Sequence, residues 1–368
     1  SVIGATSERS RFLNECFANM RPIRLMHGEQ DWLERFFKLS ANATMSNFEV
    51  EIQTALSVSL SNFIMQASAL AVVAVSAPLV INQTLSSGAL IASIFLIWRV
   101  LSPMQAIYTN ITRITRLRNA TSQINALMQI ETESKSQAPA NNLHIDHGEM
   151  QFNRISYRYP DSTESALGGV SFSVKSGQLV CISGGNGDGK TSLLKILLRM
   201  LPIQNGAILL DGVDIRQFNP IRLRRYFGYA TQEPQFFRAT IAQNLRLTRP
   251  DASDAEVEAV LKNLNAWDEL NRLKDGLNTR LGDNRQLLGS GLMQKVNLSR
   301  AFLTDAPMLL LDEPSAHLSS NDLAALVAHL TSLKSQKTIL LMTNQSELLE
   351  LADQKFVLNN GNLSVAAS

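Results

Sequence analysis

Gln178-Leu179-Val180-Cys181-Ile182-Ser183 leads directly into Gly184-Gly185-Asn186-Gly187-Asp188-Gly189-Lys190-Thr191, and a leucine-rich run follows to Leu198. An apolar run, then G-x-x-x-x-G-K-T, then a helical pattern is typical of a phosphate-binding loop between a strand and a helix. Glycines let the backbone N–H groups turn toward phosphate oxygens, and the start of the helix adds partial positive charge. The sequence therefore predicts a site for a nucleoside triphosphate.

Each residue type in this loop suits a particular part of that ligand. Lys190 would neutralise the β- and γ-phosphates, and the Thr191 hydroxyl would hold Mg²⁺. The residues expected to surround the phosphates are Gly184, Gly185, Asn186, Gly187, Asp188, Gly189, Lys190, Thr191 and Ser192.

A second acidic site follows at Ala306 to Pro314, where an apolar run ends in Asp312 and Glu313. A wholly apolar run predicts a strand buried on both faces, as in a parallel sheet. Charges at the carboxyl end of such a strand lie where these sheets bind ligands. We expect Asp312 to reach Mg²⁺ and Glu313 to polarise the attacking water.

The surrounding residues predict an α/β domain over 148–368. Residues 150–159, 170–174 and 178–183 have the pattern of short strands, and an acidic first turn at Asp254 predicts a helix. A helical subdomain is expected at about 235–305. The chain carries 34 Lys+Arg and 32 Asp+Glu, a net charge of +2, which argues against a nucleic-acid partner. Two cysteines exclude a disulfide scaffold.

A different kind of segment precedes this domain. The 47 residues from Ile52 to Trp98 contain no Asp, Glu, Lys or Arg. As one helix they would reach about 70 Å, against about 30 Å for the hydrocarbon core of a bilayer. We therefore expect two transmembrane spans, near 55–81 and 88–108, joined by a turn at Asn82 to Gly88.

The flanks of this hairpin predict its orientation. Residues 99–130 carry four arginines and no acid, and a basic flank indicates the cytoplasmic side. Residues 1–54 read as amphipathic cytoplasmic helices, and residues 131–147 as a polar linker. The polar residues of span one, among them Ser59 and Gln66, either join helices or line a wet path. Since the chain begins without Met or a signal pattern, we expect it to be cut from a longer protein.

Further motifs resemble those of the ATP-binding cassette (ABC) transporters. Tyr159, in Tyr157-Arg158-Tyr159-Pro160, is similar to the aromatic that stacks on adenine. Gln232, in Tyr229-Ala230-Thr231-Gln232, is similar to the glutamine that joins the nucleotide and its Mg²⁺ to the membrane domain. Residues 286–302 lie where the signature helix begins. Membrane segment first and cassette second implies an exporter half that uses ATP and Mg²⁺.

Residues 80–92 and 99–103 resemble the last two spans of type I secretion exporters. This resemblance implies an inner-membrane protein with six spans per half, a cytoplasmic cassette and a coupling helix near 8–25. It also implies a protein cargo, a periplasmic adaptor and an outer-membrane channel. Export of peptides or lipids is the alternative.

The chain departs from the family pattern at three motifs. The signature L-S-G-G-Q is replaced by Leu288-Gly289-Ser290-Gly291-Leu292, of which Gly289, Ser290 and Gly291 would face a partner's nucleotide. The aspartate after the acidic pair is Ser319, and the switch histidine is Asn344, which can donate to phosphate but carries no charge. Losing one charge-stabilising donor typically costs about 2.7–4 kcal/mol of barrier.

Two assemblies and two activities remain open from these departures. A homodimer would have two weakened sites, whereas a heterodimer with a partner that keeps its signature would have one hydrolytic site, and we favour the heterodimer. The chain either hydrolyses ATP during transport or only binds it and regulates a catalytic partner.

Overall fold

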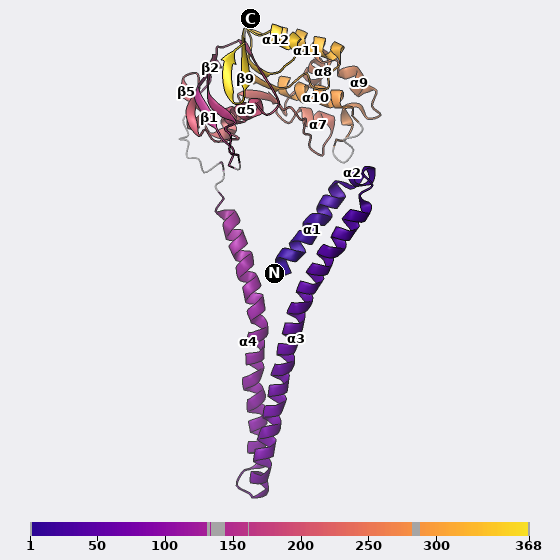
Figure 1. Cartoon of the computed structure of the whole chain (residues 1–368), viewed down its shortest axis with the longest axis vertical. Helices are drawn as coiled ribbons and strands as arrows, with labels where there is room; N and C mark the ends of the chain where they lie inside the picture. Colours follow the sequence, from indigo (N-terminus) through magenta and orange to yellow (C-terminus); the bar gives the residue numbers. More distant parts are fainter. Residues whose placement is uncertain (1, 131–132, 134–143, 161, 282–287, 367–368) are drawn as a thin grey trace. The chain divides into compact units, whose positions relative to one another are not determined.

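The computed structural model describes residues 2–130, 133, 144–160, 162–281 and 288–366, and the chain divides into two compact units, 1–131 and 132–368 (Figure 1). Most of the predicted linker, at 131–132 and 134–143, lies outside the described residues. Each unit is described by itself below.

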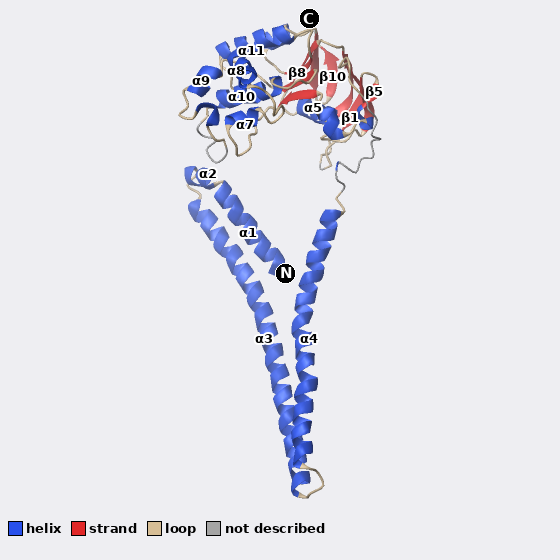
Figure 2. Ribbon diagram, turned by 180° about the vertical axis from the view of Figure 1, so that it is seen from behind, coloured by secondary structure: helices blue, strands red, loops and turns tan. Residues whose placement is uncertain are grey.

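The first unit is entirely helical within its described residues. It contains α1 (Val2–Ala18), α2 (Met20–Leu25), α3 (Glu29–Ile81) and α4 (Ser87–Met128) (Figure 2). The rings of Phe12 and Trp32 stack at a centroid distance of 5.0 Å and pack α1 against α3. The predicted boundary at residues 54 and 55 falls inside α3, which runs through it without a break.

The turn between α3 and α4 lies where the sequence predicted it. Ser86 caps α4 by accepting a hydrogen bond from the Ala89 N–H at 3.2 Å, so Ser87 and Gly88 already belong to the helix. The Leu79 carbonyl at the end of α3 accepts from the Thr84 hydroxyl at 2.8 Å and from the N–H groups of Thr84 and Leu85 at 3.0 and 3.1 Å.

Among the described helices, α3 is long and apolar enough to cross a membrane. With 53 residues it is about 80 Å long, which exceeds the roughly 30 Å of bilayer hydrocarbon. The apolar part of α4, Ser87–Val100, is shorter. The two-span arrangement therefore stays a prediction.

The second unit contains two sheets. The first is antiparallel with the order β2-β1-β4-β5, made of β1 (Met150–Tyr157), β2 (Leu167–Val174), β4 (Asn205–Leu210) and β5 (Val213–Asp214). The second has the order β10-β9-β3-β8-β7-β6, made of β3 (Leu179–Gly184), β6 (Phe227–Ala230), β7 (Met308–Asp312), β8 (Thr338–Met342), β9 (Gln354–Asn359) and β10 (Asn362–Val365). The central strands β3, β6, β7, β8 and β9 are parallel.

Burial explains this layering. Every residue of β7 and of β8 is buried, as the uninterrupted apolar run at 308–312 predicted. One face of the central sheet looks toward the antiparallel sheet. Between them the apolar side chains of α5 (Lys190–Leu197) pack with residues of both sheets in one core cluster. The other face packs against α11 (Ser320–Leu333), α12 (Ser346–Glu350) and part of α10 (Ser290–Phe302). The shorter helical segments here are α6 (Pro220–Arg224) and the 3₁₀ turn Ile215–Gln217.

A helical subdomain forms a third apolar cluster, over the region that the sequence predicted. Its elements are α7 (Ile241–Leu245), α8 (Asp254–Asn263), α9 (Trp267–Asn271), the 3₁₀ turn Gly276–Asn278 and the first part of α10. Ser253 and Glu256 form a capping box at the start of α8, and the expected helix start at Asp254 is confirmed.

One carboxylate holds the chain where it enters the cassette. Asp211, in the turn between β4 and β5, accepts hydrogen bonds from the N–H groups of residues 146, 147, 148 and 149 at 2.7–3.2 Å. Burial opposes the charge on this side chain, but the four donors outweigh it and lower the pKa of Asp211.

Candidate functional site

The phosphate-binding loop joins the end of β3 to the start of α5, as predicted. Two of its glycines leave no room for a side chain. A Cβ at Gly184 would lie 2.3 Å from the Leu358 carbonyl oxygen, and one at Gly189 would lie 2.2 Å from that of Ala166. Gly189 also has φ +104°, a conformation that favours glycine. The close packing of backbone on backbone therefore requires glycine at both ends of the loop.

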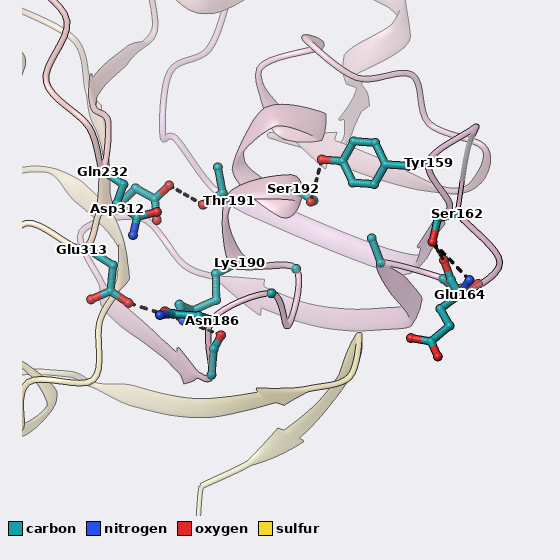
Figure 3. A pocket seen from close by; sticks show the side chains of 15 residues that line it. Tyr159, Ser162, Glu164, Asn186, Lys190, Thr191, Ser192, Gln232, Asp312 and Glu313 are labelled. Atoms are coloured by element: carbon teal, nitrogen blue, oxygen red, sulfur yellow. Dashed lines mark hydrogen bonds and ion pairs between the residues drawn. The ribbon is translucent and has the colours of Figure 1, made fainter. Parts of the chain in front are cut away.

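Lys190 lies folded over this loop and is only 7% exposed. Its Nζ donates to the carbonyl oxygens of Gly184 at 2.5 Å and Gly185 at 3.0 Å, and it lies 3.4 Å from Glu313 Oε1 (Figure 3). The ammonium group thus stands between the loop and the acidic pair. To bind a phosphate, the ammonium group would give up some of these hydrogen bonds and donate to phosphate oxygens instead.

Thr191 and Asp312 meet as a magnesium site requires. The Thr191 hydroxyl donates to Asp312 Oδ2 at 2.7 Å (Figure 3). Asp312 is 1% exposed, and its Oδ1 is buried without a hydrogen-bond partner among the described residues. Burial raises the pKa of Asp312, and the neighbouring Glu313 charge adds to this, while the Thr191 hydrogen bond opposes it.

The unpartnered Oδ1 of Asp312 fits a hard cation, which prefers carboxylate and hydroxyl oxygens. Mg²⁺ is usually held by one or two protein oxygens together with waters and substrate phosphates. The described residues contain no group of three or more His, Cys, Asp and Glu side chains that could hold a metal alone. Thr191 and Asp312 therefore suit Mg²⁺ that arrives with a nucleotide.

Glu313 is held in an unusual backbone conformation at the tip of β7. Its φ is +46°, its N–H donates to the Met342 carbonyl at 2.9 Å, and the Gln294 amide of α10 donates to the next carbonyl, that of Pro314, at 3.1 Å. A non-glycine residue at positive φ costs of order 1–3 kcal/mol and persists only when its surroundings enforce it. These two contacts hold the backbone of Glu313 and Pro314 in place, and the Glu313 carboxylate lies 3.4 Å from Lys190 Nζ.

A pocket of about 410 Å³ brings most of the predicted site residues together. Gln232, Asp312 and Glu313 lie on one side of the loop lysine, and Tyr159 lies on the other (Figure 3). The pocket is lined by Tyr159, Ser162, Glu164, Ser165, Ala166, Gly185, Asn186, Gly187, Gly189, Lys190, Thr191, Ser192, Gln232, Asp312 and Glu313.

Two contacts hold Tyr159, the aromatic residue that lines the pocket. The Tyr159 hydroxyl lies 3.0 Å from Ser192 Oγ, and its ring meets that of Tyr157 edge-on at 5.0 Å. Ser162 and Glu164 line the same wall, and sequence reasoning missed them. The one sequence signal for these two residues was their position in the polar segment between Tyr159 and β2. Such a segment contains no motif that marks a binding residue.

Some predicted residues do not line this pocket. The Asp188 carboxylate accepts from the N–H groups of Gly185 at 2.5 Å and Asn360 at 3.1 Å, so it joins the loop to the turn before β10. The Asn344 amide is bonded to Gly184. The altered signature, Gly289 to Gly291, lies at the start of α10.

The glutamine loop borders a second, larger hollow. Gln232, Thr191 and Asp312 also line a cavity of about 640 Å³. Its far wall includes Arg300, whose guanidinium donates to the Gln235 carbonyl at 3.1 Å and lies over the Phe236 ring. Gln232 thus lines both cavities. This is the position expected of a residue that joins the nucleotide site to another surface.

Comparison with known proteins agrees with this geometry. Residues 2–104 match the family model of the ABC transporter transmembrane region, and residues 167–316 match that of the ABC transporter. The fold is similar to that of a bacterial Atm1-family ABC exporter with ATP bound, with a TM-score of 0.84 and 21% identity over 99% of this chain and 66% of the other.

Curated relatives are similar along almost the whole chain. A probable multidrug resistance ABC transporter ATP-binding/permease protein of Bacillus subtilis is 28% identical over 98% of this chain and 61% of the relative. An ATP-dependent lipid A-core flippase of Pseudoalteromonas translucida is 26% identical over 99% of this chain and 62% of the relative. The chain thus spans about three fifths of the relatives' length.

The helical unit and the cassette match two models of the same family, in the order of an exporter half. The predicted fold class, a helical transmembrane region followed by an α/β cassette with a phosphate-binding loop, is confirmed. The chain therefore belongs to the ABC transporter family, and joins part of its transmembrane region to its ATP-binding cassette.

Proposed function

We propose that this chain is part of one half of an ATP-driven exporter. The observation that carries the proposal is the Lys190–Thr191–Asp312–Glu313 pocket, on a chain whose first unit matches the ABC transporter transmembrane region. The proposal places the protein in the inner membrane with its cassette in the cytoplasm, because the arginines that follow the apolar run indicate that side.

Each pocket residue has a part in this proposal. Tyr159 would stack on the adenine, and Lys190 would leave the Gly184 and Gly185 carbonyls to neutralise the β- and γ-phosphates. Thr191, Asp312 and Gln232 would hold Mg²⁺, which offsets the charge of the phosphates. Glu313 would accept the proton of the attacking water.

The relatives favour a lipid or drug substrate over a protein. Those named above are a multidrug transporter and a lipid A-core flippase, so they do not support the type I secretion that the sequence resemblance implied. On α3, Ser59 and Gln66 are exposed, and residues seven apart share one helix face. An apolar helix with exposed polar groups suits an amphiphilic molecule. The proposal therefore contains no protein cargo, periplasmic adaptor or outer-membrane channel.

The altered signature bears on the partner. Gly289 is the N-cap of α10 and has no side chain to donate, and Leu292 packs into the helical subdomain in place of a glutamine. Ser319 caps α11 instead of presenting a carboxylate. We propose that the chain pairs with a second exporter half that keeps its signature, so that one of the two sites hydrolyses ATP.

A second candidate function rests on the same residues. If both composite sites are slow, the cassette would bind ATP and close on its partner without turning it over. Glu313, retained beside Asp312, favours hydrolysis, and the substituted signature favours binding alone.

Nucleotide binding and turnover separate these candidates. We would measure MgATP binding by the full chain in detergent micelles with a fluorescent nucleotide, and ATP turnover in the same sample. Binding that Lys190→Ala abolishes, with turnover that Glu313→Gln abolishes, supports an ATPase. Binding without turnover supports the regulatory half.

The substrate class needs a separate measurement. The complete exporter half and its partner would be reconstituted in liposomes and tested for stimulation of ATP turnover by lipid A-core, by apolar cations and by an unfolded protein. Stimulation by the lipid or the cations agrees with the proposal. Stimulation by the protein alone would restore the secretion hypothesis.

A further inference from the structure

Asn344 follows β8 and makes a double contact with the first residue of the phosphate-binding loop. The Gly184 N–H donates to Asn344 Oδ1 at 2.9 Å, and Asn344 Nδ2 donates to the Gly184 carbonyl at 2.8 Å. The side-chain amide thus satisfies both backbone groups of one residue. Asn344 does not belong to the lining of the nucleotide pocket.

The register of the sheet explains why an amide fits here. Strands β3 and β8 are parallel with Ile182 opposite Met342, and the Thr343 N–H donates to the Ile182 carbonyl at 3.1 Å. Gly184 lies two residues further, so its N–H and C=O face the same neighbour. The chain has already left the strand at this point. The Asn344 amide supplies the acceptor and donor that backbone would have supplied, and adds one rung to the β3–β8 ladder.

The contact between Asn344 and Gly184 also involves the groups that are expected to hold phosphate. The Gly184 carbonyl that Asn344 contacts is also an acceptor for Lys190 Nζ, at 2.5 Å. On its other side, Gly184 packs closely against β9. The start of the loop is therefore held between Asn344 on one side and β9 on the other. This fixes the direction in which the loop leaves β3, and with it the orientation of its N–H groups.

We propose that Asn344 is a positioning residue that shapes the phosphate-binding loop from outside the pocket, and that it does not sense the γ-phosphate. The inference rests on the proposed nucleotide binding. It assigns this position a role different from the phosphate contact expected from the family resemblance. The donor and acceptor of an amide point in nearly parallel directions, whereas the two ring nitrogens of a histidine point away from each other, so a histidine does not match the N–H and C=O of one residue.

Comparison of two nucleotides tests this assignment. Backbone N–H groups of such a loop hold phosphates that ATP and ADP share, whereas a γ-phosphate contact serves ATP alone. With the full chain in detergent micelles, we expect Asn344→Ala to weaken MgATP and MgADP equally, by about three- to tenfold, from the loss of two exposed hydrogen bonds. Dissociation constants would come from displacement of a fluorescent nucleotide.

Two further variants sharpen the result. Asn344→His should lose affinity for both nucleotides as Asn344→Ala does. Asn344→Asp keeps the acceptor for the Gly184 N–H but faces the Gly184 carbonyl with negative charge, so it should bind both nucleotides more weakly than wild type. Gln345→Ala is the matched control, because the Gln345 amide donates to Glu347 and not to the loop.

Three outcomes overturn the assignment. Loss of MgATP affinity with unchanged MgADP affinity in Asn344→Ala would show a γ-phosphate contact. Unchanged affinity for both nucleotides would show that the hydrogen bonds between Asn344 and Gly184 do not contribute to nucleotide binding. Full affinity in Asn344→His would show that no amide is needed. Wild-type protein that binds neither nucleotide would instead overturn the proposed function, and this inference with it.

Discussion

Single side chains at the nucleotide pocket combine burial with charge. Asp312 is almost completely buried, keeps one oxygen without a hydrogen-bond partner among the described residues, and receives the Thr191 hydroxyl on the other. Leaving a buried carboxylate half-satisfied costs stability. A cation that fills the open position recovers this cost, so the pocket is suited to bind metal and nucleotide together.

Asp312→Asn should therefore lower affinity for MgATP by tenfold or more and leave ATP affinity in EDTA almost unchanged. The reason is that the amide replaces a charged metal ligand while the phosphate-binding loop stays in place. Titrations with and without Mg²⁺ would measure both values. Asp305→Asn, at a carboxylate that is 76% exposed, is the control. Equal losses with and without Mg²⁺ would contradict the metal role.

His329 on α11 provides a pH dependence. Burial lowers the pKa of His329 below 6.5, the Lys337 charge adds to this, and Nε2 is buried without a partner among the described residues. In the unfolded chain the imidazole takes up its proton at higher pH, so the unfolded state binds more protons as pH falls below about 6.5. Stability is full above that pH and is lost toward the lower, folded pKa.

We expect His329→Leu to flatten this dependence. Thermal unfolding of the full chain at pH 7.5 and 5.5 should show a larger fall in Tm for the wild type than for the variant. His317→Leu is a control, because the His317 side chain is exposed. A variant that loses as much Tm as the wild type would mean that other groups set the acid sensitivity.

Among the helices, α10 is held by a buried lysine. Lys295 is 1% exposed, and its Nζ lies 2.6 Å from Glu269 of α9 and 3.2 Å from Asp322 of α11, and donates to the Asn265 carbonyl. Asp322 in turn accepts from the Ser319 hydroxyl at 2.7 Å. One ammonium group thus joins the helix that begins at the altered signature to the loop that follows Glu313.

Lys295→Met should destabilise the chain by about 1–3 kcal/mol, because it leaves the largely buried Asp322 without its counter-charge, while Glu269, which is 43% exposed, can be solvated. Lys262→Met, which removes an exposed lysine paired with Glu258, should cost less than about 1 kcal/mol. Urea unfolding monitored by tryptophan fluorescence would give both values. Similar midpoints for the two variants would show that the ion pairs of Lys295 contribute little.

The elements near the phosphate-binding loop were predictable because their signals are local. The apolar run at 308–312 predicts a buried strand, and glycines with Lys190 and Thr191 predict the loop without knowledge of the rest. The network of Lys295 and the contact of Asn344 with Gly184 were not predictable, since their partners are 26–160 residues away. In α3 the apolar run starts at Ile52, but no proline or glycine marks an end there, so the helix continues across it.

For the molecule as a whole, the altered signature bears on whether two copies can form a working pair. Gly289 has an extended backbone at the start of α10, and a Cβ placed there meets nothing within 4 Å. A serine would therefore fit without disturbing the helix. Gly291 differs, because a Cβ there would lie 2.8 Å from the His317 carbonyl oxygen.

Restoring the signature should show what its loss costs. In a pair made of two copies of this chain, Gly289→Ser with Ser290→Gly should raise ATP turnover by at least tenfold, since one charge-stabilising donor is worth about 10²–10³ in kcat. Phosphate release at saturating MgATP would measure this, with Asp305→Asn, at an exposed side chain just beyond α10, as the control. No increase would indicate that two copies of this chain do not close on nucleotide.

The Asp211 contact described above has a mechanical consequence. Tension that arrives along the chain at residue 145 meets four hydrogen bonds that share one carboxylate. A pull from residue 145 reaches the bond of residue 146 first, and all four bonds must break before β1 is peeled from its sheet. Pulling on the chain upstream of the cassette should therefore turn the antiparallel sheet as a block, and Asp211→Ala should lower the rupture force in single-molecule stretching.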